Sequence, residues 1–544
     1  MNKRAFSWLT FAIAALFVQT WACPAEQGKG TLSQGPDWFL GGVIYELNPL
    51  VMSESGRLAD VTERLAEIRE LGVNAIYVMP IFEHEPLLTY RIYDYYKIAP
   101  EVGTPEDLHA FVRRAHELGM RVLLDLVIAH SPAGFEIIKW PDEVASVFSH
   151  AQGPIGRMFL EAQRSVQERL AKLKDSDPAE YEQAVTRNAL LSFSPLGSTK
   201  PQWFLRDGAG KPVLTYPNPG WGLAFDYGNP EVHKYFADIA SYYVREFDID
   251  GWRVDAPQNN FDPKIFPNAS NSLELLRAVS ASIKSVKPDA ILFAENVWAD
   301  GGFGKEGAPV FDEVCEISYW HWLRWEMAQR RKDKRDFSDF TGKDLAGLVS
   351  KGAPTHGRRR AIHVGTHDTE RVREMWPEAW RALTILHYTL PGAPMIYGGA
   401  EIGETDRFFV HWDRSDEAIR KFHIALGRLL DEDGLRHGDF TPIAPQRQGV
   451  ATPCLFVPVG EPVCGFVRTT EKQLAVIIVN FGKADAHVTV SVPTERLKAA
   501  SSVRYLVLNG LSGDKQTLSQ DELSSLAVTV LPGDGVILLV TTQG

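Results

Sequence analysis

The sequence predicts an α/β protein, a (β/α)8 TIM barrel with an inserted subdomain after its third strand and a C-terminal antiparallel β-sandwich. Short apolar runs alternate with segments of helical periodicity from residue 41 onward, which is typical of βα units around a parallel sheet. One connection, residues 131–230, is far longer than an ordinary loop. After residue 438 the pattern changes to alternating β-type runs separated by Gly, Asp and Lys.

Eight apolar runs carry the strand signal of the barrel. Helical segments separate them, as the spacing of Val232, Phe236 and Ile239 illustrates. Eight βα repeats are the number that closes a barrel, and in such a barrel the reactive side chains come from the carboxyl ends of the strands. The runs cover residues 43–47, 74–79, 121–127, 250–254, 290–294, 313–317, 361–365 and 394–398.

The long connection contains a charged helical stretch at residues 157–175 and then a part rich in Trp, Pro and Gly. An insertion of this length is usually a functional subdomain. The expected units are a signal peptide over residues 1–22, the barrel over 23–130 and 231–437, the insertion over 131–230 and the sandwich over 438–544.

The first residues have the layout of an export signal. Lys3 and Arg4 precede an apolar run at residues 6–18, and Ala22 stands directly before Cys23. The run is about thirteen residues long, whereas a membrane span needs ~20, so no membrane span is expected here. We therefore expect an exported protein, periplasmic or extracellular, with Cys23 as a candidate site of lipid anchoring.

Charge and cysteine content exclude several classes of protein. The formal net charge is −12, and no dense Lys/Arg cluster offsets it, which argues against a nucleic-acid partner. No cluster of Cys and His has the spacing of a zinc site. Cys454 and Cys464 flank a segment that could fold as a hairpin, and they form either a disulfide or two buried thiols, while Cys315 is expected in the core.

Acidic residues follow three of the predicted barrel strands. Asp255 comes two residues after Arg253, so both side chains point to the same face of a strand. A cation within ~4–6 Å lowers the pKa of a carboxyl group by about 1–3 units, so Arg253 is expected to keep Asp255 ionised, as a nucleophile requires. Glu295 follows the apolar fifth strand, where a raised pKa suits a proton donor. Asp368, preceded by His367, is expected to end the seventh strand.

Asp125 and His130 lie around the end of the third predicted strand. Any one of these residues alone would be read as part of a structural ion pair or of the core. Three acids at the ends of strands four, five and seven of one barrel instead favour a catalytic site. Two facing carboxyl groups suit glycoside hydrolysis, in which one protonates the leaving oxygen and the other, ~5–5.5 Å away, forms a covalent glycosyl-enzyme that water resolves with retention.

Five short motifs resemble those of the α-amylase family, glycoside hydrolase family thirteen, over roughly residues 40–544. They are DLVIAH, GWRVDAP, AEN, HVGTHDTER and LPGAPMIYGGAEIG, in the family's order. The resemblance implies Asp255 as nucleophile, Glu295 as general acid/base and Asp368 as the carboxylate that holds sugar hydroxyls in the transition state. The supporting residues that it implies are Arg253, His130, His367 and, from YRIYDYY, Tyr90, which should stack under the sugar at the cleavage point.

The sequence also departs from the family pattern. Ala129 stands where many relatives have an Asn that binds calcium, and Ala224 stands where the family supplies an Asp ligand. Because Ca²⁺ takes six to eight oxygen ligands, we expect no calcium site and no other cofactor. Ala256 and Pro257 follow Asp255, and the Lys-His pair that many relatives use on the leaving side of the bond is missing. The helix-rich insertion is a further departure, so maltooligosaccharides are as suitable a substrate as starch.

Three functions are compatible with these residues. The leading hypothesis is a retaining hydrolase of α-1,4-glucosidic bonds in starch-type glucans or maltooligosaccharides. A 4-α-glucanotransferase, in which a sugar hydroxyl replaces water, would use the same three carboxylates, and the sequence does not separate the two. The third hypothesis is a non-catalytic relative that binds sugar or a partner protein, and the presence of Asp255, Glu295 and Asp368 together argues against it.

Overall fold

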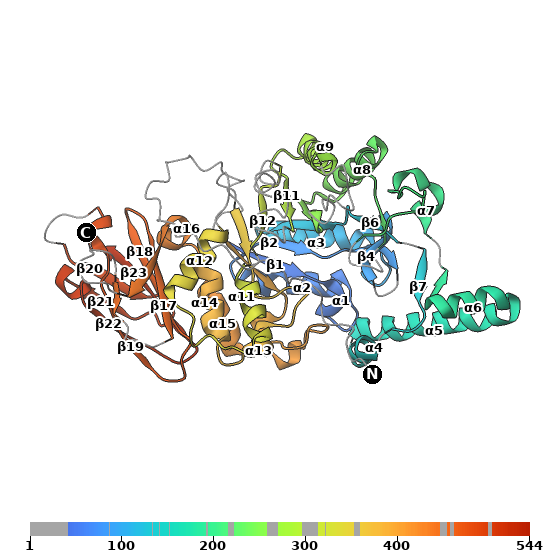
Figure 1. Ribbon diagram of the computed structural model, residues 1–544. Helices are drawn as coiled ribbons and strands as arrows, with labels where there is room; N and C mark the ends of the chain where they lie inside the picture. The colour runs from blue at the N-terminus through green and yellow to red at the C-terminus, as the bar shows by residue number, and fades with distance from the viewer. Residues whose placement is uncertain are drawn as a thin grey trace.

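The computed structural model contains a closed barrel of eight parallel strands, which confirms the predicted fold class (Figure 1). Around the barrel the strand order is β1, β14, β13, β12, β11, β10, β5, β2. The structure describes residues 42–85, 88–132, 134–140, 142–151, 153–191, 194–215, 222–257, 270–295, 314–320, 322–352, 359–445, 454–456, 462–498 and 503–543.

Two predictions concern the N-terminus, namely the signal peptide at residues 1–22 and a lipid anchor at Cys23. Both fall outside the described residues and stay predictions. In the part of the chain that the structure describes, no helix combines the length and the apolar character that crossing a bilayer requires.

The barrel strands consist largely of fully buried residues, as a parallel sheet covered on both sides requires. Neighbouring strands pair in parallel all the way round, and β1 closes the ring by pairing with both β2 and β14. The strands are β1 (Val43–Leu47), β2 (Val73–Val78), β5 (Arg121–Leu126), β10 (Gly251–Val254), β11 (Ile291–Ala294), β12 (Ile317–Trp320), β13 (Arg359–Ile362) and β14 (Ala393–Tyr397).

Two strands are displaced from their predicted positions. The sixth begins at Ile317 rather than at residue 313, and Glu316 just before it accepts a hydrogen bond from the backbone N–H of Leu292 at 2.8 Å. The seventh begins earlier than predicted, because its pairing with β12 starts at Arg359. The prediction that Asp368 ends this strand is therefore wrong, and Asp368 lies in the loop that follows.

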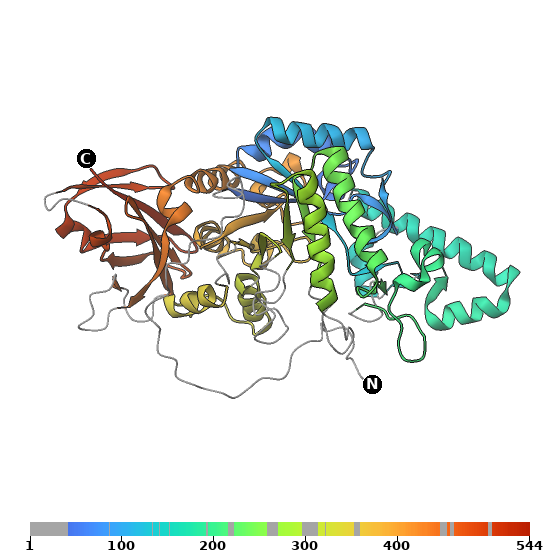
Figure 2. The same ribbon diagram turned by 90° about the horizontal axis from the view of Figure 1, so that it is seen from above.

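Helices surround the barrel, and local sequence fixes where several of them begin (Figure 2). Thr104 and Asp107 form a capping box at the start of α3 (Pro105–Glu117), and the Asn229 side chain caps α8 (Pro230–Phe247). Both helices have Pro in the first turn, where no hydrogen-bond donor is needed. The other main barrel helices are α2 (Leu58–Arg69), α9 (Ser270–Val286), α11 (Trp322–Lys332), α12 (Gly342–Gly352), α14 (Trp380–Thr389) and α15 (Glu417–Leu429).

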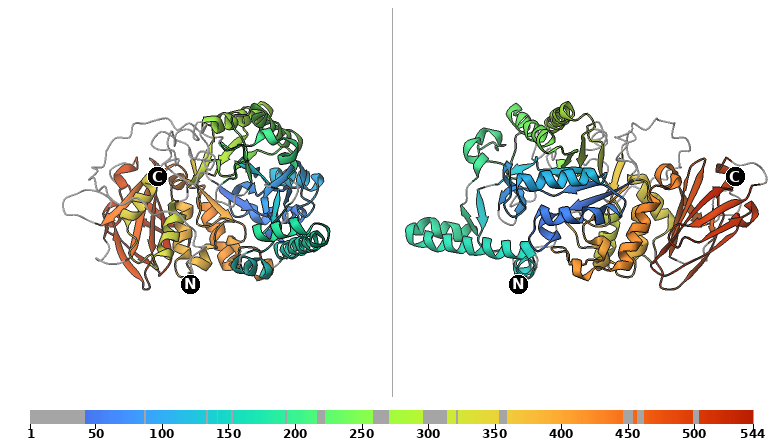
Figure 3. Two further views of the ribbon diagram at one scale, coloured as in Figure 1. Left: turned by 45° about the vertical axis from the view of Figure 1, so that its right-hand side comes forward. Right: turned by 180° about the vertical axis from the view of Figure 1, so that it is seen from behind.

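The insertion after β5 is mainly helical. The predicted helical stretch is present as α5 (Gly153–Ser176), which packs with α6 (Pro178–Arg187) as a hairpin that projects from the barrel (Figure 3). Its small apolar core includes Ile138, Val166 and Leu170. The remaining elements of the insertion are β6 (His130–Ser131), β7 (Phe135–Ile137), α4 (Asp142–His150), β8 (Ala189–Leu191), α7 (Pro195–Thr199) and β9 (Leu223–Ala224).

Charged residues meet where the insertion lies against the hairpin of β3 (Phe82–Glu85) and β4 (Leu88–Ile98). Arg91 Nη1 contacts Glu85 Oε1 at 3.1 Å, and both side chains are about 4% exposed. Arg169 of α5 pairs with Glu136 of β7 at 3.0 Å. Burial raises the pKa of Glu85 to about 7, although Arg91 acts to lower it. The junction therefore holds a carboxyl group that titrates near neutral pH.

Glu85→Gln is expected to remove a pH-dependent loss of thermal stability. The pKa of Glu85 is about 7 in the folded protein and ~4.3 in an unfolded chain. The stabilisation that protonated Glu85 contributes is thus complete below about pH 4. It is lost as the pH rises towards 7, because Glu85 ionises at a lower pH in the unfolded chain than in the folded protein. Calorimetry should show the Tm of Glu85→Gln rising relative to wild type from pH 4.5 to pH 7.5. A pH-independent difference for Glu85→Gln would contradict the prediction.

The C-terminal strands form the predicted sandwich at the end of the barrel opposite the α5–α6 hairpin (Figures 1 and 2). Strand β18 is apolar without alternation because both of its faces are buried. Leu474, Val476 and Ile478 face the sandwich core, whereas Ala475 and Ile477 belong to the core shared with the barrel. The strands are β15 (Asp439–Pro445), β16 (Cys454–Phe456), β17 (Val463–Thr469), β18 (Gln473–Asn480), β19 (Ala486–Val490), β20 (Tyr505–Asn509), β21 (Lys515–Leu518), β22 (Leu526–Val530) and β23 (Gly535–Thr542).

All described pairings within this sheet are antiparallel except that of β15 with β16. Of the two cysteines for which a disulfide or buried thiols are predicted, Cys464 is a buried free thiol, and the side chain of Cys454 lies outside the described residues. Burial also raises the pKa of Cys464. Cys315 is buried in the barrel core, as predicted.

Candidate active site

Polar side chains lie at the carboxyl end of the barrel interior. Each follows, two positions later along its strand, a residue whose side chain faces the interior. Ile44, Leu123 and Phe293 belong to the apolar cluster inside the barrel. Side chains alternate along a strand, so the second residue after each of them points inward as well. By this rule the strands deliver a set of polar groups to one mouth of the barrel, namely Glu46, Asp125, Glu295 and, on β10, Arg253.

Arg253 is the centre of the site, and its side chain is only 1% exposed. Its Nη1 donates to both carboxylate oxygens of Asp125, at 3.0 and 2.9 Å, and to Asp255 Oδ1 at 2.8 Å. Its Nη2 contacts Glu295 Oε2 at 2.7 Å. One guanidinium therefore holds three carboxyl groups, and it places Asp255 and Glu295 side by side.

Two tyrosines complete the surroundings of Asp125. The hydroxyl of Tyr77 donates to Asp125 Oδ2 at 2.6 Å, and that of Tyr90 donates to the same oxygen at 2.8 Å. The Tyr90 ring stacks on the imidazole of His367, with centroids 5.4 Å apart and an interplanar angle of 14°. Tyr90, implied by sequence to lie under a sugar, is thus fixed by contacts on both its hydroxyl and its ring.

His367 connects Asp368 to the other carboxylates. Its Nε2 lies 3.1 Å from the Tyr90 hydroxyl and 3.7 Å from Asp368 Oδ1, while its Nδ1 contacts the buried carboxylate of Glu46. Burial lowers the pKa of His367, but the charges of Asp368 and Glu46 outweigh this and raise it to about 9. His367 is therefore a cation at neutral pH.

A strained backbone position contacts Glu295. Ala256 has φ +34°, in the region that residues with a side chain rarely adopt, and its N–H donates to Glu295 Oε2 at 2.9 Å. Because Ala256 directly follows Asp255, this conformation ties the chain after β10 to the carboxyl group after β11. The hydrogen bond from Ala256 thus helps to hold the two carboxyl groups together.

The electrostatics agree with one sequence expectation and overturn another. Burial raises the pKa of Glu295, as predicted for a proton donor, although Arg253 acts to lower it. The prediction that Arg253 keeps the pKa of Asp255 low is wrong. Burial raises the pKa of Asp255 well above its usual value, the charge of Arg253 opposes this, and the nearby Glu295 and Asp125 add to the increase. The physical reason is that Arg253 divides its charge among three carboxylates in a site with little water.

Asp368 differs from the other two acids. Its side chain is 53% exposed, whereas those of Asp255 and Glu295 are 15% and 12% exposed. Burial of the carboxyl group acts to raise its pKa, but the positive charges of His367, Arg324 and Arg407 outweigh this and lower it. Asp368 is thus an ionised carboxylate at the open side of the site.

His130 lies behind Tyr90. Its Nε2 is 3.0 Å from the Tyr90 carbonyl oxygen, and burial lowers its pKa to about 3, so the ring is neutral. Sequence reasoning missed Glu46 and Tyr77, which lie opposite each other in the pairing of β1 with β2. The signal that could have found Glu46 is a single charged residue inside the otherwise apolar run VIYEL.

Comparison with known proteins agrees with this architecture. The family model of the α-amylase catalytic domain matches residues 33–437. A cyclomaltodextrinase of Geobacillus thermopakistaniensis is 27% identical over 411 residues, which cover 69% of this chain and 58% of that protein. A maltogenic α-amylase of Bacillus acidopullulyticus is 25% identical over 450 residues, which cover 79% of this chain and 63% of that protein. The chain thus spans about three fifths of the length of these curated relatives.

Solved structures show the same fold. The α-amylase of Geobacillus thermoleovorans superposes with a TM-score of 0.65 at 20% identity, covering 93% of this chain and 99% of that chain. An α-amylase from Lactobacillus plantarum gives a TM-score of 0.64 at 18% identity, covering 92% and 99%. The family model matches well over half of the sequence, and the chain therefore belongs to the α-amylase family, glycoside hydrolase family thirteen.

Proposed function

We propose that the protein is a retaining glycoside hydrolase that cleaves α-1,4-glucosidic bonds, with Asp255 as nucleophile and Glu295 as general acid/base. The observation that carries this proposal is the single guanidinium of Arg253, which contacts Asp255 at 2.8 Å and Glu295 at 2.7 Å. The shared guanidinium keeps the two carboxyl groups near each other, and a retaining enzyme uses two neighbouring carboxyl groups, one as nucleophile and one as acid, ~5–5.5 Å apart.

The reaction needs one proton on this pair of carboxyl groups. In the first step the Glu295 proton passes to the glycosidic oxygen, the bond from that oxygen to the anomeric carbon breaks, and Asp255 bonds to the carbon. In the second step water gives a proton to Glu295, and its hydroxyl replaces Asp255 on the carbon. Because burial raises the pKa of both groups, the pair retains a proton to higher pH than two exposed carboxyl groups would.

Other residues suit binding of the sugar ring. Asp368, ionised and half-exposed, offers two acceptors for sugar hydroxyls, and the cationic His367 beside it offers a donor. Tyr90 is held nearby through its hydroxyl and its stacking on His367. An apolar ring face of this kind suits stacking against a pyranose.

The relatives named above support short or cyclic α-1,4-glucans as substrates, since their names are cyclomaltodextrinase and maltogenic α-amylase. Maltooligosaccharides and cyclomaltodextrins are therefore the substrates that we propose. The same intermediate would allow transfer to a sugar hydroxyl, so products longer than the starting maltooligosaccharide would identify a 4-α-glucanotransferase instead.

The proposal is tested by the stereochemistry of the products and by trapping of the intermediate. NMR of maltoheptaose hydrolysis should show the α-anomer appearing first, before mutarotation. A 5-fluoro-α-glucosyl fluoride should label one peptide, the one that contains Asp255. Initial formation of the β-anomer, or a label on another carboxylate, would refute the assignment.

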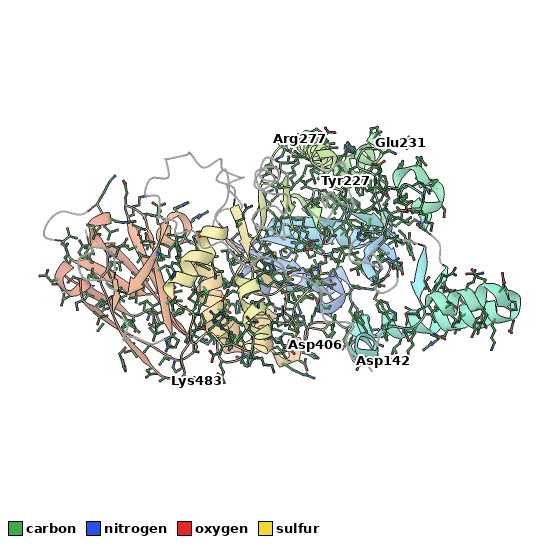
Figure 4. All side chains as sticks on the ribbon, in the orientation of Figure 1. Asp142, Tyr227, Glu231, Arg277, Asp406 and Lys483 are labelled. Atoms are coloured by element: carbon green, nitrogen blue, oxygen red, sulfur yellow. The ribbon has the colours of Figure 1, made fainter. Side chains whose placement is uncertain are left out.

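We also propose that the calcium site of the family is replaced by hydrogen bonds within the protein. Ala129 and Ala224 offer no side-chain ligand, and they lie together, because the backbone N–H of Phe225 donates to the Ala129 carbonyl at 3.3 Å. The carbonyls of the two preceding residues are also engaged. Tyr95 donates to that of Val127 at 2.6 Å, and Tyr227 donates to that of Ile128 at 2.8 Å. Figure 4 labels Tyr227 near the start of α8. Without side-chain ligands at these two positions, and with neighbouring carbonyls engaged by the protein, the junction offers few of the six to eight oxygens that Ca²⁺ takes.

Treatment with a chelator is therefore expected to leave activity and Tm unchanged. The measurement is maltoheptaose hydrolysis and calorimetry before and after incubation with EGTA and gel filtration. As a positive control for the junction, Tyr227→Phe should lower the free energy of unfolding by about 1 kcal/mol, because it removes one buried hydrogen bond. A drop in Tm after EGTA that added Ca²⁺ restores would show that the junction binds calcium.

A further inference from the structure

Glu46 is a buried carboxylate at the edge of the site, and His367 is its one side-chain partner among the residues that the structure describes. Glu46 lies in β1, where every residue is buried, and its exposed fraction is 0%. Burying a charge is costly unless the charge is paired. Within the described part of the chain, Oε1 contacts His367 Nδ1 and, more weakly, the His367 backbone N–H at 3.4 Å, and Oε2 has no hydrogen-bond partner. The negative charge of Glu46 is therefore directed at His367.

The hydrogen bonds fix the protonation state of His367. The Tyr90 hydroxyl donates its proton to Asp125, because a carboxylate only accepts, so Tyr90 must accept from His367 Nε2. Glu46 likewise accepts from His367 Nδ1. Both ring nitrogens therefore carry protons, and the ring is an imidazolium. Burial favours the neutral ring, and the negative charges of Asp368 and Glu46 oppose it.

We propose that Glu46 is a positioning residue that keeps His367 as an imidazolium and directs its Nε2–H at Tyr90 and Asp368. The inference rests on the proposed function, since it explains how His367, a hydrogen-bond donor of that site, is kept protonated and oriented. A neutral His367 would lose one of its two N–H donors, and the ring would no longer be held by both Glu46 and Tyr90. The charged groups around His367 are Glu46 on β1, Arg253 on β10, Glu295 after β11, Asp368 on its own loop and Arg407 after β14.

The first test measures the ring directly. NMR of ¹³C-labelled histidine, assigned with the variant His367→Gln, should show His367 protonated at pH 8 in the wild-type protein. In Glu46→Gln its pKa should fall by roughly 1–3 units, the range for loss of an adjacent opposite charge. A wild-type His367 that titrates below pH 7, or an unchanged pKa in a folded Glu46→Gln, would overturn the inference. The wild-type titration remains decisive even if the variant does not fold.

The second test measures catalysis. In Glu46→Gln, kcat/KM for maltoheptaose should fall by about 10- to 100-fold, which corresponds to one charge-assisted hydrogen bond. Glu46→Asp keeps the charge and should retain the high pKa of His367. The matched control is Glu401→Gln, a glutamate that is also buried but hydrogen-bonded to Tyr45, and its kcat/KM should stay at the wild-type value. Absence of hydrolysis by the wild-type protein would refute the proposed function, whereas wild-type kcat/KM in a folded Glu46→Gln would refute only the role of Glu46.

Discussion

Replacing Asp255 with Asn is expected to lower kcat by roughly 10⁴- to 10⁶-fold, the range seen when a covalent nucleophile is removed. Asn has the same shape as Asp but cannot form the glycosyl-enzyme. The measurement is release of reducing sugar from maltoheptaose, with purified enzyme at several concentrations. A loss of only a few-fold would show that another group attacks the anomeric carbon.

The same variant should fold at least as stably as the wild type. Asp255 shares Arg253 with Asp125 and Glu295, and these like charges contribute to its raised pKa. A neutral amide relieves that repulsion, so the Tm should stay the same or rise. Asp238→Asn, an exposed position on α8 paired with Lys234, is the matched control and should change neither kcat nor Tm. A large drop in Tm for Asp255→Asn would mean that lost activity reports misfolding.

The sequence was sufficient to predict the barrel because its strands are buried on both sides. Runs such as VIYEL and RVLLDLV stand out from their surroundings, and β1 lies where it was predicted. The residues brought together by adjacent strand ends were predictable for the same reason, since Asp255 and Glu295 follow neighbouring strands β10 and β11. Where burial alone sets the pattern of apolar residues, the spacing of those residues and the length of the apolar run are strong signals of secondary structure.

The errors arose where long-range contacts decide the outcome. The displaced start of β12 follows a residue, Glu316, that contacts Leu292 of the neighbouring strand, and that contact has no trace in the local sequence. The raised pKa of Asp255 depends on how many carboxylates share one guanidinium. The spacing of Arg253 and Asp255 predicts their contact but says nothing of Asp125 and Glu295 on the neighbouring strands. Sequence spacing therefore predicts which two residues on one strand contact each other. The fold is needed to identify the whole cluster of charged residues.

The shared cluster also has a consequence for how the two acids divide their roles. Arg253 contacts Asp255 and Glu295 through different nitrogens, so the guanidinium alone does not decide which of them holds the proton. Asp368 and its negative charge help to raise the pKa of Glu295, whereas Asp255 has Arg253 and the Asp125 carboxylate as neighbours. A substrate oxygen next to Glu295 can accept its proton, and the anomeric carbon next to Asp255 can accept only an ionised carboxylate. Binding of substrate thus selects the reactive arrangement.

Glu295→Gln is expected to lower kcat for maltoheptaose by about 10²- to 10⁴-fold, the usual contribution of a general acid. The loss in the first step, measured as the burst of fluoride release, should be much smaller for an α-glucosyl fluoride, because fluoride leaves without protonation. The covalent intermediate should then accumulate, since Glu295 is also the base that activates water in the second step. Mass spectrometry of the variant mixed with the fluoride measures this as an added glucosyl group on the peptide that contains Asp255.

The comparison of the two substrates separates the role of Glu295 from that of Asp255. Asp255→Asn should lose activity on both substrates, because bond formation to the anomeric carbon does not depend on the leaving group. Adding azide to Glu295→Gln should restore turnover of the fluoride, since azide attacks the intermediate without a base, and it should have no effect on Asp255→Asn. If the burst of fluoride release in Glu295→Gln were slowed as much as maltoheptaose hydrolysis, the side chain would be acting in substrate binding rather than in proton transfer.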